Sequence, residues 1–316
     1  MAKRLLLAVI LSLTAAACAT PQTDDLRRGS HGLPARAAVA KPVFFAQRTK
    51  ECGPAALAMA LVHSGVRLRP EDLVAEVYNQ GREGSLTPAV LAAVRRHGRI
   101  AYPLNNLTDL LRSVHRGRPA IVLQNLGLRL LPRWHYAVIV GYDFGKETVT
   151  LHSGRTEFLE MALETFEHTW ARGGHWALLT LRPGEFPDPV DEGVYVRAVA
   201  GVERAGRAGT AAKAYGAAVQ RWPDNLIAWM GLGNSLYRLN RRRAAAAAFR
   251  SATLRHPGNA AAFNNLAHVL GELGRFGEAE AAARKAIALG GPDVATYRAT
   301  LRDILARRKR NSGGKP

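Results

Sequence analysis

The chain has little cysteine and no motif rich in metal ligands. Its 316 residues contain two cysteines, Cys18 and Cys52, and no Cys-x-x-Cys or His-x-x-x-His pair. Two thiols cannot build a disulfide framework, and the sequence supplies no set of zinc ligands. The glycine pair that ends at Gly233 falls inside an expected helix rather than after a strand, which excludes a nucleotide-binding loop there. We therefore expect neither a metal nor another cofactor.

Acidic residues are also scarce. There are 25 Asp+Glu against 44 Lys+Arg, a net charge of +19. Residues 1–189 contribute +7 (23 − 16), and residues 190–316 contribute +12 (21 − 9). No basic run is interleaved with aromatic residues, as stacking on bases would require, so nucleic acid is not an expected partner. A solvated, Arg-rich surface and attraction to anionic lipid or polysaccharide remain as alternatives.

Long hydrophobic runs are missing except at the start of the chain. Lys3 and Arg4 precede an apolar run at residues 5–13, which is too short for a permanent membrane helix and predicts a signal peptide over residues 1–17. Cys18 follows three alanines and resembles the lipid-attachment cysteine of bacterial lipoproteins; cleavage after an ordinary Ala-x-Ala site is the alternative. With Ala19 next, lipidation implies an outer-membrane lipoprotein facing the periplasm, and the alternative implies a soluble periplasmic protein.

The middle of the chain predicts an α+β fold. Residues 18–40 lack periodicity, which indicates a tether. Apolar periodicity and Pro or Gly boundaries predict helices at 54–63, 70–78, 88–97 (with Thr87 as cap) and 107–115, then strands at 120–124, 135–142, 148–152 and 175–181. Helices followed by strands favour a helix packed on an antiparallel sheet, over residues 41–185.

The region from 190 to 310 repeats with a period of 34 residues. In the unit 226–259, the repeated positions hold Trp229, Leu232, Gly233, Leu236, Ala245, Phe249, Ala252 and Pro257. The units before and after it place similar residues at the same offsets, which is the tetratricopeptide signature. Small residues such as Gly233 are expected to interlock with large ones such as Phe249. The segment 297–307 would be the solvating end helix. Such arrays commonly bind a protein partner, and a structural spacer is the alternative.

Cys52 carries the strongest chemical signal. Pro54 suits the first turn of a helix, so the thiol should lie at a helix N-terminus, where free N–H groups favour the nucleophilic thiolate. Gln47 could donate its amide to an oxyanion. His135 opens a predicted strand and could act as general base, and His175, which opens another, is its rival. A packing role for Cys52 is the alternative.

A third residue usually orients the histidine. If the turn after His135 is centred near Phe144, directly paired residues have numbers that sum to 288, and Ser153 faces His135. A serine can accept a hydrogen bond from the ring but cannot offset the charge of an imidazolium. The sequence thus predicts a Cys–His dyad with Ser153 as a weak orienting residue.

Gln47, the segment ECGPAALAM around Cys52 and the segment HYAVIVGYD from His135 together resemble the bacteriocin-processing, double-glycine leader peptidases and their papain-like relatives. The resemblance covers about residues 41–182. It implies that Cys52 is the nucleophile, His135 the general base and Gln47 the oxyanion donor. The orienting aspartate of that family, usually followed by proline, is replaced here by Ser153 and Gly154, so activity depends on whether the dyad works without it.

The leading interpretation is an exported cysteine peptidase that cleaves a peptide or protein substrate, with the repeats recruiting the substrate or a partner. A catalytically silent lipoprotein that binds a peptide is the first alternative. Acyl transfer or amide hydrolysis on a non-protein substrate is the second, since the same nucleophile and base suit both reactions.

Overall fold

The computed structural model describes residues 20–29, 31–48 and 50–313. They fall into two compact units. The first unit runs to Leu181 and includes Phe186–Val190, and the second comprises Arg182–Glu185 and the chain from Asp191 onward. The predicted signal segment and Cys18 lie outside the described residues.

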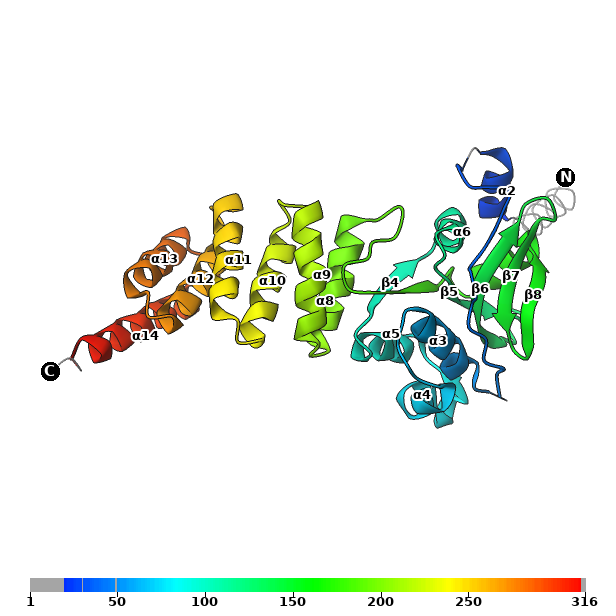
Figure 1. The fold of residues 1–316 in the computed structure, drawn as a ribbon, viewed down its shortest axis with the longest axis horizontal. Coiled ribbons are helices and arrows are strands. Elements are labelled where there is room, and N and C mark those ends of the chain that lie inside the picture. Colours follow the sequence, from blue (N-terminus) through cyan, green and yellow to red (C-terminus); the bar gives the residue numbers. More distant parts are fainter. Residues whose placement is uncertain (1–19, 30, 49, 314–316) are drawn as a thin grey trace, which may run out of the picture. The chain divides into compact units, whose positions relative to one another are not determined.

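The first unit is built on a seven-stranded antiparallel sheet (Figure 1). The strand order is β4-β9-β5-β6-β7-β8, and β1 pairs with the far end of β6. The strands are β1 (Arg36–Ala38), β4 (Ile100–Leu104), β5 (Ala120–Asn125), β6 (Trp134–Asp143), β7 (Thr148–Ser153), β8 (Thr156–Ala162) and β9 (Ala177–Leu181). A separate hairpin joins β2 (Tyr78–Asn79) to β3 (Gly84–Ser85). The central strands β5 and β6 are buried almost throughout, which explains their continuous apolar character.

Helices cover both faces of this sheet. Helix α3 (Cys52–His63) contacts β5, β6 and β9, and α6 (Leu107–His115) and α7 (Leu163–Ala171) also pack on the sheet. In Figure 1, α3 and α6 lie on opposite sides of β5 and β6. Every residue from Gly53 to Leu61 is buried. A helix that is apolar all round belongs inside the molecule, and this burial fixes the position of its first residue, Cys52.

The α+β architecture is as predicted, and most expected elements are present within a residue or two. Helix α3 begins at Cys52 rather than at Pro54. Helices α4 (Pro70–Val77) and α5 (Thr87–Arg96) follow, but Thr87 is the first helical residue and Leu86 takes the cap position. Strand β9 begins only at Ala177. Strands β4 and β8 and helix α7 were not predicted.

Part of the predicted tether is folded. Helix α2 (Pro21–Arg28) lies within it, and β1 continues the sheet. The buried carboxylate of Glu167, on α7, accepts the backbone N–H groups of Gln22 at 3.0 Å and Thr23 at 2.6 Å. These are unpaired N–H groups of a helix N-terminus, so the distant Glu167 stabilises α2. A local reading of composition could not find this interaction.

The second unit is all helical. Its helices are α8 (Glu192–Arg204), α9 (Ala208–Arg221), α10 (Leu226–Arg238), α11 (Arg242–Arg255), α12 (Ala260–Glu272), α13 (Phe276–Leu289) and α14 (Val294–Gly313). Consecutive helices pack against each other as antiparallel pairs in a series (Figure 1). The last helix, α14, covers the expected end segment and extends beyond it at both ends.

Small and large residues interlock between these helices as the 34-residue period predicts. A methyl group at Gly233 would overlap the ring of Phe249, and one at Gly231 would overlap the ring of Tyr215. A second regularity of the repeats was not predicted. Asp191, Asn225 and Asn259, spaced by the same period, each accept the backbone N–H of the residue three positions later. Each repeat therefore carries its own N-cap.

None of the helices within the described residues is both long enough and apolar enough to cross a membrane. The same part of the chain contains no group of three or more His, Cys, Asp or Glu side chains that could hold a metal ion.

Candidate active site

The thiol of Cys52 sits at the N-terminus of α3, as predicted. The next residue, Gly53, lies directly against Ser85 of β3, and any side chain there would overlap it. The small residue therefore allows β3 to approach the first turn of the helix. The hydroxyl oxygen of Ser85 is buried and has no hydrogen-bond partner among the described residues. Ser85 is thus a polar group beside Cys52 that sequence reasoning missed.

The backbone of Tyr136 links Cys52 to the strand that carries His135. The β6–β7 ladder ends at Val138, so the backbone before it is not paired with β7. There the side-chain amide of Gln47 donates to the carbonyl oxygen of Tyr136 at 3.1 Å, and a backbone hydrogen bond from Tyr136 reaches the sulfur of Cys52. Gln47 is buried, and this bond fixes it beside the thiol. One of its two N–H groups remains for another acceptor.

His135 contacts the residue that was predicted to orient it. Its Nε2 atom lies 2.8 Å from the Oγ atom of Ser153. The predicted register is nevertheless wrong. Paired residues of β6 and β7 have numbers that sum to 290 or 291, as in Val138 with His152, and an irregularity lies between Ile139 and Gly141. Ser153 reaches the ring from a diagonal position rather than a directly opposite one.

Two cavities meet at Cys52. One, of about 350 Å³, is lined by Gln47, Arg48, Lys50, Cys52, Trp134, His135, Gly154 and Arg155. The other, of about 480 Å³, is lined by Cys52 together with Lys50, Arg82, Glu83, Gly84, Ser85, Leu86, Thr87, Leu123, Trp134 and Tyr136. The first presents a cationic rim, and the second includes several apolar side chains. A chain laid across the thiol would meet different chemistry on its two sides.

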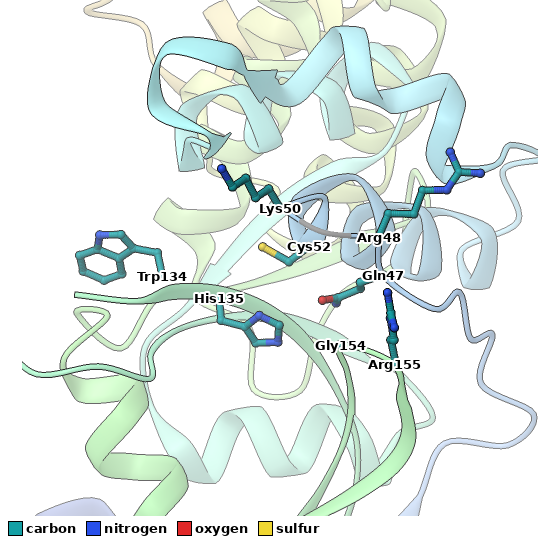
Figure 2. Close-up of a pocket in the computed structure, with 8 residues that line it drawn as sticks. All are labelled: Gln47, Arg48, Lys50, Cys52, Trp134, His135, Gly154 and Arg155. Atoms are coloured by element: carbon teal, nitrogen blue, oxygen red, sulfur yellow. The ribbon is translucent and has the colours of Figure 1, made fainter. Parts of the chain in front are cut away.

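Figure 2 shows how the side chains of the first cavity lie. The sulfur of Cys52 points toward Trp134, whereas the imidazole of His135 is turned toward Gly154. Within the described part of the chain, the ring's hydrogen bond goes to Ser153. Because Nε2 contacts Ser153, Nδ1 is the ring nitrogen left to take a proton from the thiol.

Burial dominates the titration of both groups. It raises the pKa of the Cys52 thiol above its ordinary value, although backbone hydrogen bonds from Tyr136, Gly53 and Cys52 itself act in the opposite direction. Burial also lowers the pKa of His135. Both shifts favour the uncharged form of the group. The N–H groups at the helix N-terminus lower the pKa of Cys52, as expected, but desolvation outweighs them and the net shift is upward.

The rival histidine lies elsewhere. His175 occupies the turn before β9, in the left-handed conformation with φ of 51°, and its ring packs edge-on against Trp170 at 4.9 Å. It lines neither cavity at Cys52. The residues that sequence reasoning missed around the first cavity are Arg48, Lys50, Trp134, Gly154 and Arg155. Their nearness in sequence to Gln47, Cys52, His135 and Ser153 was the signal that could have found them.

Family models match both parts of the chain. Residues 41–177 match the Peptidase_C39 like family, and residues 203–242 and 232–294 match the tetratricopeptide repeat. A search of curated proteins gives no significant match. The chain therefore has a Peptidase_C39-like domain with an antiparallel sheet and helices, followed by a helical region of tetratricopeptide repeats.

Solved structures also resemble the two parts. A protein from Bacillus anthracis described as a C39-like peptidase has 18% identity and a TM-score of 0.39, and the match covers 45% of this chain and 96% of that protein. The TPR2B domain of yeast Sti1, solved with pHsp70, has 15% identity and a TM-score of 0.36, covering 37% and 98%. The Sgt2 TPR domain from Aspergillus fumigatus has 18% identity and a TM-score of 0.36, covering 43% and 89%.

Proposed function

We propose that the protein is a cysteine peptidase in which Cys52 attacks a peptide carbonyl carbon and His135 takes the thiol proton. The bond to the leaving nitrogen then breaks as His135 returns that proton, and water hydrolyses the resulting thioester. The single observation that carries this proposal is that Cys52, at a helix N-terminus, and His135 line one cavity with Gln47. Gln47 and the backbone N–H of Cys52 would support the oxyanion.

The test is covalent labelling by an electrophilic peptide probe, followed by peptide hydrolysis. Cys52→Ala should abolish both. His135→Ala should slow both by about 10²-fold or more, the usual contribution of a general base. His115→Ala, which removes an exposed histidine at the end of α6, is the matched control and should be neutral. Equal labelling in wild type and His135→Ala would rule out the dyad.

A second candidate function is peptide binding without turnover. Two observations favour it: the pKa of Cys52 is raised, and His135 contacts a serine rather than a carboxylate. A silent binding domain should bind peptides with equal affinity in wild type and Cys52→Ser and show no hydrolysis in either. Measurable turnover that disappears in Cys52→Ser would exclude this candidate.

The remaining proposals concern recruitment and location. The repeats would recruit a protein substrate or partner, since such repeats commonly mediate protein contacts. Residues 1–17 would direct export, and Cys18 would carry a lipid anchor at the outer membrane. Mass spectrometry of the N-terminal peptide tests the lipid, and Cys18→Ala should move the protein from the membrane fraction to the soluble fraction. Unchanged fractionation would contradict the anchor.

A further inference from the structure

The loop between β5 and β6 exposes an unusual amount of apolar surface. We name residues 126–133 the leucine loop; its sequence is LGLRLLPR, and Trp134 follows at the start of β6. The exposed fractions are 71% for Leu128, 91% for Leu130 and 73% for Leu131, and Trp134 is 55% exposed. Single exposed leucines are common on soluble proteins, but a contiguous group marks an interaction surface.

Hydrogen bonds hold the two ends of the leucine loop together. Asn125, which is 3% exposed, accepts the backbone N–H groups of Gly127 at 3.0 Å and Arg133 at 2.8 Å. The N–H of Leu126 donates to the carbonyl oxygen of Arg133 at 2.9 Å. Arg172, on the segment after α7, donates to the carbonyl oxygen of Asn125 at 3.1 Å. These hydrogen bonds fix both ends of the leucine loop, and they therefore fix where the exposed leucines lie on the surface.

The charged residues within the leucine loop have one sign. Arg129 and Arg133 alternate with the leucines, and both are exposed. No Asp or Glu occurs in the sequence between Asp109 and Asp143. Arginine beside leucine and tryptophan is the combination found where a protein surface enters the headgroup region of an anionic bilayer: the cations meet lipid phosphates and the apolar side chains reach the acyl boundary.

The shape of the leucine loop favours a bilayer over a peptide as its binding partner. Leu130 at 91% exposure has almost nothing of the protein around it. A bound peptide needs walls on two sides, whereas a projecting side chain is covered only by a partner that surrounds it. A bilayer does so without a preformed pocket. Trp134, at the edge of the loop, is the residue type that prefers the membrane interface.

We propose that the leucine loop is a membrane-docking element that inserts Leu128, Leu130 and Leu131 into the surface of an anionic bilayer. Trp134 lines both cavities at Cys52, so docking would hold the cleft next to the lipid surface. A substrate segment close to a membrane would then reach Cys52 directly. This inference is independent of catalysis.

The experiment uses the full chain with vesicles of phosphatidylethanolamine and phosphatidylglycerol that carry brominated acyl chains. Bromine quenches tryptophan only at short range, and comparison with Trp134→Phe isolates the emission of Trp134. Because this readout is local, any attachment through residues 1–19 is common to all variants. We expect quenching of Trp134 in wild type and its loss in Leu130→Ser/Leu131→Ser. Leu254→Ser removes a leucine of 76% exposure on α11 and should leave the quenching unchanged.

Two further arms make the result decisive. Arg129→Gln/Arg133→Gln should lower the quenching at least fivefold on anionic vesicles, and pure phosphatidylcholine vesicles should give little quenching with any variant. Unquenched Trp134 in wild type on bound vesicles would overturn the proposal. So would equal quenching in wild type and Leu130→Ser/Leu131→Ser, which would leave the leucine loop as a contact for a protein or peptide. None of these measurements needs Cys52, so they can be repeated in Cys52→Ala, and their failure would not affect the proposed peptidase.

Discussion

The Nε2 atom of His135 lies 2.8 Å from the Oγ atom of Ser153, at the place where the resemblance to the double-glycine leader peptidases predicts an aspartate. A hydroxyl can fix the orientation of the ring, but it adds no negative charge. The pKa of His135 is accordingly lowered by burial, with no carboxylate to raise it. This pair therefore determines how the site should respond to substitution and to pH.

Ser153→Asp should increase the reactivity of the thiol. A carboxylate beside the ring favours the imidazolium and raises the pKa of His135, and an imidazolium beside Cys52 favours the thiolate. We expect alkylation of Cys52 at pH 7 to become about tenfold faster, which corresponds to about one pKa unit. Ser153→Ala, which removes the hydrogen bond without adding charge, is the control and should not accelerate it. Equal rates in the two variants would show that Ser153 does not act on the ring.

The pH dependence of alkylation in the wild type should show one ionisation, above the ordinary value of 9.0 for a cysteine. Burial sets the direction of both pKa shifts. The thiol of Cys52 stays protonated to higher pH than in the unfolded chain, and His135 stays neutral to lower pH than its ordinary 6.5. No imidazolium is then present at neutral pH to stabilise a thiolate. Iodoacetamide rates measured from pH 4 to 11 check this, and a reactive plateau below pH 6 would indicate a preformed thiolate–imidazolium pair instead.

Gly233→Ala should destabilise the repeat region by about 1–3 kcal/mol, since the new methyl group overlaps the ring of Phe249 in a packed core. Gly216→Ala is the matched control. Gly216 is also inside a helix, α9, but no atom lies within 4 Å of the added methyl group, so alanine should be neutral or stabilise by up to about 1 kcal/mol. Chemical denaturation of the wild type and of both variants measures their free energies of unfolding. Equal free energies for Gly233→Ala and Gly216→Ala would contradict the observed packing.

Glu167→Gln should release helix α2. The substitution keeps the size of the side chain but replaces the carboxylate, whose two oxygens accept hydrogen bonds from the N–H groups of Gln22 and Thr23, with a neutral amide. Hydrogen bonds to a charged group contribute about 1.5–3 kcal/mol, so exchange of these two amides with solvent should become about ten- to a hundredfold faster. Hydrogen exchange resolved by peptide would detect it. Glu71→Gln, which removes an exposed carboxylate on α4 that pairs with Arg48 and not with α2, should leave exchange at Gln22 and Thr23 unchanged.

The candidate site could be predicted from the sequence to the extent that it is local. Cys52, Pro54 and the alanines after them define a helix start within a few residues, and His135 opens a run of strand-forming residues. The resemblance of these two segments to a known family then predicted that Cys52 and His135 belong to one site. The same holds for the repeats, because the signature of one 34-residue unit places Gly233 and Phe249 on its two adjacent helices, α10 and α11.

Other features depend on residues far apart in the chain. The irregularity near Gly141 changes the pairing of β6 with β7, so Ser153 meets His135 by a diagonal contact that a regular ladder does not give. Helix α2 forms in an aperiodic segment because Glu167 satisfies its first N–H groups. Neither the irregularity nor the acceptor has a signal in the local sequence.

Both kinds of architecture and the residues that could form the dyad can be predicted from the amino-acid sequence, because periodicity, caps and small residues act over one or two turns of chain. The electrostatic state of Cys52 and His135 depends on the complete fold. Desolvation of Cys52 and His135 is a property of everything packed around them, and here it outweighs the helix N-terminus that the sequence made visible.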